Sequence, residues 1–383
     1  MQKLSRLASR LSFLHCHSLE LCYITAHILN ICLRIRAMLK NKKLGCLSLL
    51  LLSPMAMAMQ PLDDQSLSAT TGQDGISVGV NLSKVNFNQA AIIDTDGFTT
   101  TALGSTVALN SKAALVMAAS QGAASPTIGV DFVQTFNADG SIVHNPAQLL
   151  NMSIDSDAGA AANGGAFANI ALSLGNGVNG MRIRPFSVYL APDVTGVISS
   201  LAGSTYTRGS VFNSGTTTLK SANIKELLRV SNNIDIKFVS NNKPTMNFQL
   251  GASPQGHMVM FGGAIDSICA PSATQADGCS FNLVSGATGA KFDLQMTSTD
   301  ANGFSLNGFY AGIENGAGAV PDAVVFGHAG TSDKMDLAIK NVMLGDAGLS
   351  NANTFNGLQN GSLGNIGAVG ISATNLKMRV SGM

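Results

Sequence analysis

The sequence predicts an all-β protein with a large antiparallel β-sandwich-like architecture. Helical periodicity is almost absent after residue 75, whereas short segments with an apolar residue at every second position recur. Gly, Asn-Gly and Asp-Gly turns separate these segments, and such dipeptides favour tight hairpins. One face of each strand is then buried and the other is solvated, which is typical of antiparallel sheets.

The expected strands follow one another along the chain without a strict repeat period, which counts against a regular solenoid. The alternating segments are 76–87, 126–136, 181–190, 233–239, 245–252, 291–297, 334–344 and 375–380. The turn dipeptides are Asp96-Gly97, Asp139-Gly140, Asn163-Gly164, Asn179-Gly180, Asn302-Gly303 and Asn307-Gly308. One short helix is expected within 219–230. The Gly-, Ser- and Thr-rich stretch 195–223 is the expected internal boundary or long connection within the β-rich region 76–383.

Residues 38–58 have the three parts of a secretory signal peptide. A basic start with three lysines precedes an apolar run of about ten residues, which is too short to span a bilayer stably. Pro54 then breaks the helix, and Ala56 and Ala58 supply the small side chains that signal peptidase accepts. We expect cleavage after Ala58, with Met59 as the new N-terminus. The chain is therefore expected to reach the periplasm, the outer membrane or the cell surface.

Residues 1–37 do not fit this plan. They mix His, Cys and Arg through interrupted apolar stretches. They can be interpreted either as an extended leader or as the result of a start site placed too far upstream, and the completeness of the leader at Met38 favours the second.

The charge balance argues against nucleic acid as a partner. Residues 1–58 hold eight Lys or Arg and one Glu, so the rest of the chain has fifteen positive and twenty-one negative residues and a net charge of −6. A mildly acidic chain without a Lys/Arg cluster does not favour binding to polyanions.

Cys269 and Cys279 are the two cysteines that follow the expected leader. They bracket a short polar loop, which suits one disulfide in an oxidising compartment. Two free thiols are the alternative. A metal site is disfavoured because no neighbouring His or Cys supplies further ligands.

The segment 59–75 lies between the expected cleavage site and the first strand. Asp63 or Asp64 can cap a brief helical turn through 66–70, with Leu62 and Leu67 as an apolar pair. Gly72 then ends the turn, Gln73 follows, and Asp74-Gly75 leads the chain into the strand.

This segment also resembles a known family. "MQPLDDQSLSATTGQDGIS" is similar to the N-terminal signature of FilA-like pilus-assembly proteins, which are exported by Gram-negative bacteria. The matching positions are Met59, Leu62, Asp63, Asp64, Leu67, Ser68, Thr71, Gly72, Gln73, Asp74, Gly75 and Ile76. The resemblance covers about twenty residues. It implies a protein tied to a filament or the outer surface, with pilus or surface-assembly proteins as partners, and it implies no catalytic residues.

The first strand offers a way to bind such partners. Ile76, Val78, Val80 and Leu82 share one face of the expected strand 76–87, directly behind the signature segment. Such a strand can add to the sheet edge of a neighbouring subunit, a second copy of this chain included, or can pair within its own sheet. The second arrangement is preferred. The chain lacks the leader and the C-terminal aromatic residue of known pilin subunits.

Catalytic and metal-binding patterns are weak. His144, His257 and His328 are isolated in sequence and are expected at the surface or on edge strands. The Asp clusters at 94–97, 155–159 and 300–303 could bind Ca²⁺, but ordinary Asx turns are favoured because none completes a calcium loop. We therefore expect an exported structural or surface protein without catalysis or cofactor. The alternatives are an outer-membrane β-barrel, which would also show alternating strands but usually has aromatic girdles, and a secreted glycan- or calcium-binding β protein.

Overall fold

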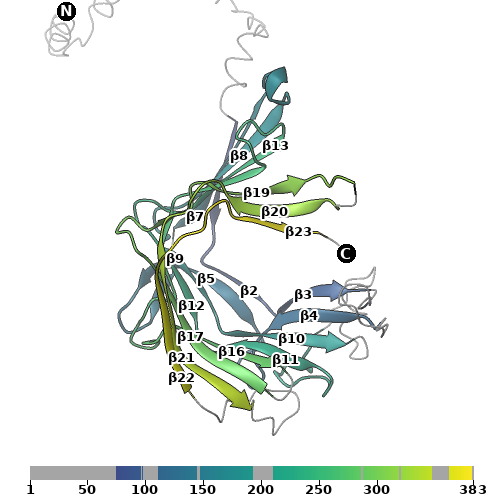
Figure 1. Ribbon diagram of the computed structural model, residues 1–383, viewed down its shortest axis with the longest axis vertical. Coiled ribbons are helices and arrows are strands. Elements are labelled where there is room, and N and C mark those ends of the chain that lie inside the picture. Colours follow the sequence, from purple (N-terminus) through teal and green to yellow (C-terminus); the bar gives the residue numbers. More distant parts are fainter. Residues whose placement is uncertain are drawn as a thin grey trace, which may run out of the picture. The chain divides into compact units, whose positions relative to one another are not determined.

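The computed structural model divides the chain into two compact units, 1–73 and 74–383. It describes residues 75–95, 97, 111–144, 147–192, 210–285, 288–318, 321–346 and 362–381. These residues form two antiparallel sheets, and their helical element is a single 3₁₀ turn at Ala161–Asn163. The predicted all-β class is confirmed. Together the sheets make a nearly closed, barrel-like sandwich (Figure 1).

The smaller sheet has eight strands, in the order β1-β7-β8-β13-β14-β19-β20-β23. Their bounds are β1 Ile76–Asn81, β7 Gln148–Asp157, β8 Phe167–Leu174, β13 Thr245–Gly251, β14 Val259–Gly262, β19 Phe309–Glu314, β20 Ala323–His328 and β23 Lys377–Val380. Every neighbouring pair in this sheet is antiparallel.

The larger sheet has fifteen strands and branches at β17. Its main row is β2 Lys84–Phe87, β5 Ile128–Phe136, β9 Gly180–Ile183, β12 Ile234–Phe238, β15 Ala264–Ile268, β17 Thr288–Ser298, β21 Met335–Asp346 and β22 Ser362–Ile371. Its side branch is β16 Cys279–Ser285, β11 Lys225–Val230, β10 Phe186–Pro192, β4 Ala113–Ala118 and β3 Gln89–Asp94. The short strands β6 Ile142–His144 and β18 Phe304–Ser305 pair with β5 and β15.

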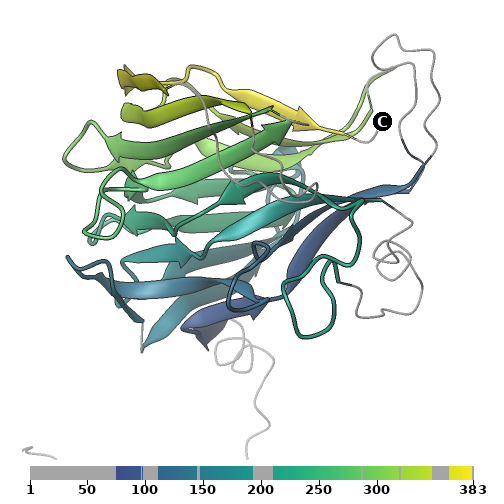
Figure 2. The same cartoon turned by 90° about the horizontal axis from the view of Figure 1, so that it is seen from below.

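The two sheets are joined by repeated crossings of the chain. It passes from one sheet to the other at β1–β2, β6–β7, β8–β9, β12–β13, β14–β15, β18–β19, β20–β21 and β22–β23. In the eight-stranded sheet and in the main row of the larger sheet, neighbouring strands therefore succeed one another in the order in which they occur along the chain. Figure 2 shows this succession, with the first strands on one side of the unit and the last strands on the opposite side.

Gly263 shows how one crossing is made. It separates β14 from β15 with φ +82°, and an added Cβ would lie 2.0 Å from the carbonyl oxygen of Lys243. A side chain is thus excluded both by the left-handed backbone and by the neighbouring main chain.

One apolar core lies between the sheets. Leu149, Val178 and Phe238 are buried there, and residues of both sheets pack around them, including Leu174 on β8 and Met181 on β9. This contact fixes the two layers together, because burial of apolar surface is the main favourable term in folding.

A second core lies on the side branch of the larger sheet. Residues 211–224 cover β4 and β10, and Tyr189 meets Phe212 edge to face with ring centroids 5.9 Å apart. The Tyr189 hydroxyl donates a hydrogen bond to the Ala119 carbonyl at 2.8 Å. Val211, Phe212 and Leu219, from the expected connection, are therefore part of the core, whereas 195–209 lie outside the described residues.

Three predictions about secondary structure are wrong. The expected single strand 76–87 is two strands, because the chain bends at 82–83, where the Ser83 carbonyl accepts a hydrogen bond from Phe132 N–H in the other sheet. The expected helix within 219–230 is instead strand β11, held between β10 and β16. Tertiary pairing there overrides the helix propensity of its Lys, Glu, Leu and Arg residues. The alternating segment 181–190 is likewise divided, between β9 and β10.

Candidate interaction surface

Strand β1 forms one free edge of the eight-stranded sheet. It pairs on one side with β7, in the register Ile76↔Ile154, Val78↔Met152 and Val80↔Leu150. No described strand lies on its other side. Ile76 is 61% exposed and Val80 is 37% exposed. We call β1 and β2 the leading edge, because β2 ends the larger sheet in the same way.

The sequence of β1 explains its two faces. Ile76, Val78 and Val80 alternate with Ser77 and Gly79, so apolar side chains point to one side of the sheet and small polar ones to the other. The strand starts at Gly75, whose φ of +58° and closeness to the Ile154 carbonyl oxygen, 2.2 Å from an added Cβ, require glycine. β1 contains no charged residue.

Strands β22 and β23 form the opposite free edge, which we call the trailing edge. β22 pairs with β21 and β23 with β20, and no described strand lies beyond either of them. The ten residues of β22 include no charge. Exposed large apolar side chains are concentrated here: Leu363, Ile366, Val369, Ile371, Leu376, Met378 and Val380.

One row of apolar side chains runs from edge to edge across the eight-stranded sheet. The registers connect Ile76 to Ile154, Ile170, Phe248, Val259, Ala311, Phe326 and Met378. Val259 is 7% exposed in the middle of this row, whereas Ile76 and Met378 at its ends are 61% and 53% exposed. The row is thus covered in the middle and open at both ends.

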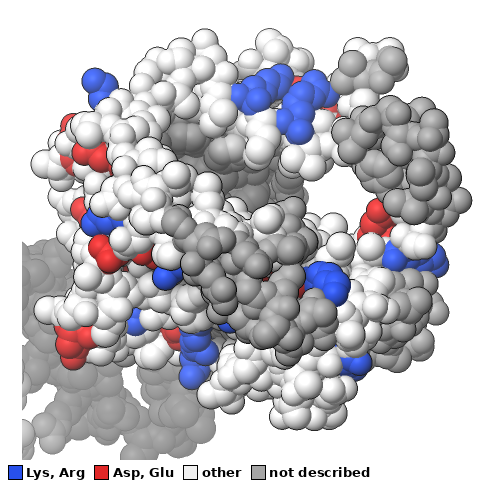
Figure 3. Space-filling view, turned by 60° about the horizontal axis from the view of Figure 1, so that its bottom comes forward, with Lys and Arg blue, Asp and Glu red and all other residues white. Residues whose placement is uncertain are grey.

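The opposite face of the trailing edge bears a small ionic cluster. Lys377 and Arg379 on β23 both pair with Glu314 on β19, and the Arg379 Nη1 to Glu314 Oε2 distance is 2.9 Å. The hydrogen bond from Lys377 lowers the pKa of Glu314. The two basic side chains of β23 therefore share one carboxylate within the molecule, and the cluster keeps one positive charge. Figure 3 shows charged side chains in such small groups, with uncharged surface between them.

A third edge, β3, ends the side branch of the larger sheet. Ile92 on β3 is 75% exposed. The two end strands of the eight-stranded sheet, β1 and β23, already belong to the leading and trailing edges. A chain that pairs with β3 would therefore extend the larger sheet alone.

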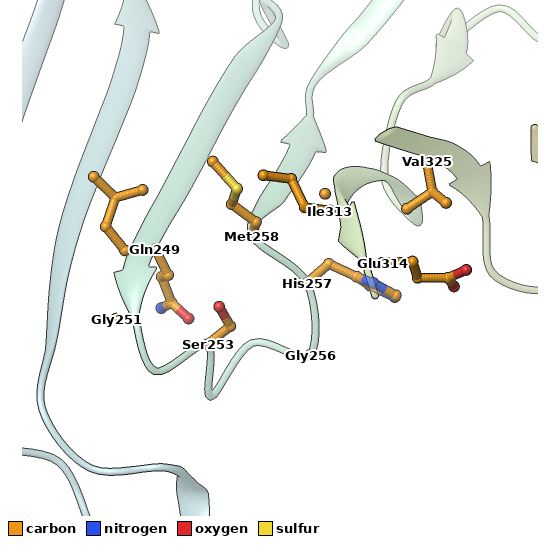
Figure 4. Close-up of a pocket in the computed structure, with 11 residues that line it drawn as sticks. Gln249, Gly251, Ser253, Gly256, His257, Met258, Ile313, Glu314 and Val325 are labelled. Atoms are coloured by element: carbon orange, nitrogen blue, oxygen red, sulfur yellow. The ribbon is translucent and has the colours of Figure 1, made fainter. Parts of the chain in front are cut away.

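A pocket of about 430 Å³ lies between the loop 252–258 and strands β19 and β20 (Figure 4). His257 stacks on Tyr310 with ring centroids 3.7 Å apart, and Glu314 lines the same pocket as Ser253. Among the described residues, no hydrogen bond joins His257 to Ser253 or Glu314. The pocket therefore lacks the nucleophile–base contact that acyl-transfer chemistry requires.

The predicted disulfide is confirmed. Cys269 and Cys279 are bonded, with Cα atoms 5.2 Å apart, and both are fully buried. The Asp clusters form turns, as expected: Asp94 accepts from Gly97 N–H, Asp157 from Gly159 N–H and Asp300 from Asn302 N–H. No three His, Cys, Asp or Glu residues in the described ranges come together as a potential metal site.

The histidines lie in three different environments. His144, on the short strand β6, contacts Asp131 at 3.0 Å, and His257 lines the pocket. His328 was expected at the surface or on an edge, but it is 5% exposed on β20 and packs against Phe309. That prediction is wrong, because an isolated His in an alternating segment carries no sign of the loop that covers it.

Of the predicted interaction segment, the structure describes Gly75, Ile76, Val78 and Val80, all at the leading edge. Ala58, Met59, Leu62, Asp63, Asp64, Leu67, Gly72, Gln73 and Asp74 lie outside the described residues, as do the expected leader and helical turn. The trailing edge was not singled out from the sequence. The uncharged segment 362–371 was the signal that could have indicated it.

Comparison with known proteins gives one partial match. The model of a family of unknown function, DUF6160, matches residues 38–132, which is about a quarter of the chain. No curated protein and no solved structure matches. The described part of the chain contains no helix long and apolar enough to cross a membrane.

Proposed function

We propose that this protein is an exported structural component of a cell-surface filament or a similar surface assembly, and that it acts by contact rather than by catalysis. The observation that carries the proposal is the leading edge. Its strand β1 pairs with β7 on one side, has no described strand on the other, carries no charged residue, exposes apolar side chains and directly follows the segment 59–75. Edge strands of this kind bind other chains by adding to their sheets.

Two further observations support export and assembly. The family match starts at Met38, where the expected signal peptide starts, and it includes both the segment 59–75 and β1. The buried disulfide suits an oxidising compartment. The resemblance of 59–75 to FilA-like proteins adds a link to pilus assembly.

Mechanical shearing of host cells tests the proposal. Sheared, periplasmic and membrane fractions are analysed for this protein by intact mass. We expect a chain that starts at Met59 and is two hydrogens lighter than the reduced form in the sheared fraction. Confinement of the same chain to detergent-resistant outer membrane would contradict the proposal and favour an integral membrane protein.

An edge variant makes this test specific. Ile76→Lys places a charge on the leading edge, whereas Ile313→Lys places one at a position on β19 that is 67% exposed and lies inside the sheet. We expect Ile76→Lys to shift the protein from the sheared to the periplasmic fraction, and Ile313→Lys to leave its distribution unchanged. Equal effects of the two variants would show that the leading edge has no special role.

A further inference from the structure

We infer that copies of this chain join head to tail, with the trailing edge of one copy (β22 and β23) against the leading edge of the next (β1 and β2). This inference rests on the proposed function and names the partner as a second copy. Both edges belong to the same two layers, since β1 and β23 end the eight-stranded sheet and β2 and β22 end the main row of the larger sheet. A copy placed beside another can thus extend both layers together.

Strand direction permits this contact. All pairs are antiparallel, and the smaller sheet has eight strands, so β1 and β23 run in opposite directions. A second copy in the same orientation therefore presents its β1 antiparallel to β23. The main row of the larger sheet also counts eight strands, so β2 meets β22 antiparallel as well. An odd number of strands would have required a parallel pair.

The side chains of the two edges are compatible. The apolar face of β1 carries Ile76 and Val80, and the same face of β23 carries Met378 and Val380, which are 53% and 60% exposed. Pairing would cover both ends of the apolar row. On the other face, Lys377 and Arg379 are already paired with Glu314 and would meet the small residues Ser77 and Gly79.

The usual protection of edge strands is present on only two of the four strands. Proteins commonly block free edges with charged residues, Pro or bulges. β1 and β22 have neither charge nor Pro, whereas β2 carries Lys84 and β23 carries Lys377 and Arg379. Each proposed contact, β23 with β1 and β22 with β2, therefore joins one strand that bears at least one basic side chain to one that bears no charge. A contact between two different edges is heterologous, so it produces an open filament unless its rotation closes a ring.

Cysteine cross-linking tests the contact. The full chain is expressed with its own leader and purified, and the Cys269–Cys279 bond is verified by intact mass. Under mild oxidation, we expect the double variant Val78→Cys/Met378→Cys to form a ladder of dimers, trimers and higher multimers. A mixture of the two single variants should form a mixed dimer and no ladder.

Two controls complete the experiment. Val78→Cys/Ile313→Cys carries the same number of added thiols but places one inside the sheet, and we expect no ladder from it. Ile76→Lys added to the ladder-forming variant should abolish the ladder, whereas Ile313→Lys should not. Without oxidation, the wild-type protein should sediment as a concentration-dependent series of oligomers.

Several outcomes would overturn the inference. A folded double variant that yields no ladder would do so, as would dimers from Val78→Cys alone, which indicate pairing of two leading edges. If purified protein stays monomeric but the native chain is found in the sheared fraction, the surface function stands and the partner is a different protein. If the ladder forms but the native chain is confined to the outer membrane, the head-to-tail contact stands and the proposed filament function falls.

Discussion

Arg182 on β9 and Asp235 on β12 face each other in register and form a bidentate ion pair. Arg182 Nε lies 2.6 Å from Oδ1 and Nη2 lies 2.7 Å from Oδ2, and both side chains are less than 10% exposed. Arg182 also donates to the Gly140 carbonyl at 3.0 Å. Arg182 thus connects β9 and β12 to the turn between β5 and β6, where Gly140 lies.

We expect Arg182→Met to destabilise the fold by about 3–5 kcal/mol, because it leaves the carboxylate of Asp235 buried and unpaired. The double variant Arg182→Met/Asp235→Leu should recover most of this loss. Urea unfolding of both variants and the wild type measures the difference. If the double variant is no more stable than the single one, the loss comes from packing and not from the unpaired charge.

Asp131 provides a test of pH dependence. Burial alone raises the pKa of Asp131, but hydrogen bonds from Arg184 and His144 outweigh it and hold the pKa below its usual 3.8. Because the folded-state pKa is the lower one, the stabilisation is complete above about pH 4 and is lost as the pH falls through the folded-state value. We expect the unfolding free energy to fall in this acid range, and Asp131→Asn to flatten that slope. An unchanged slope would assign the acid sensitivity to other carboxylates.

Replacement of the cysteines by serine tests the disulfide. The Cys269–Cys279 bond closes a loop with a sequence separation of 10. Its loss should cost about 3 kcal/mol in the chain-entropy model. We expect a lower thermal unfolding midpoint for Cys269→Ser/Cys279→Ser, and the same decrease when the wild type is unfolded in reductant. A decrease in the variant alone would point to the buried serines rather than to the missing bond.

Two glycines separate backbone strain from crowding. Gly263 and Gly256 both have positive φ, +82° and +96°, but an added Cβ meets main-chain atoms at Gly263 and nothing within 4 Å at Gly256. Gly256→Ala should cost roughly 1 kcal/mol for its left-handed backbone. Gly263→Ala should lower the unfolding free energy by clearly more, because the crossing between β14 and β15 must widen to make room for the added methyl group. Equal losses in urea unfolding would mean that the crossing adjusts freely.

The sequence predicted the strand class well because apolar alternation records which face of a strand is buried. The bends at 82–83 and 184–185 lie where the alternation changes phase, between Leu82 and Val85 and between Ile183 and Phe186. The prediction of one continuous strand for each segment overlooked this change. Nor did the sequence show that the polar face of the larger sheet is covered. Asp131, Arg182 and Asp235 alternate with apolar residues, like solvated side chains, yet the structure buries all three.

The sequence allowed only one of the two edges of the candidate surface to be predicted. The leading edge follows a distinctive segment and could be found by its position in the chain. The trailing edge has no such neighbour. Its role depends on which strands lack partners, and this is a property of the complete sheet order that local patterns do not contain.

The repeated crossings of the chain also determine how the β unit can come apart. Neither sheet is built from one contiguous stretch of residues, since the chain crosses between them eight times. A single proteolytic cut cannot release one layer intact, and no truncation of the gene encodes one layer alone. The two layers must therefore fold and unfold as one cooperative unit. Most of the contacts in the chain join residues that are distant in sequence.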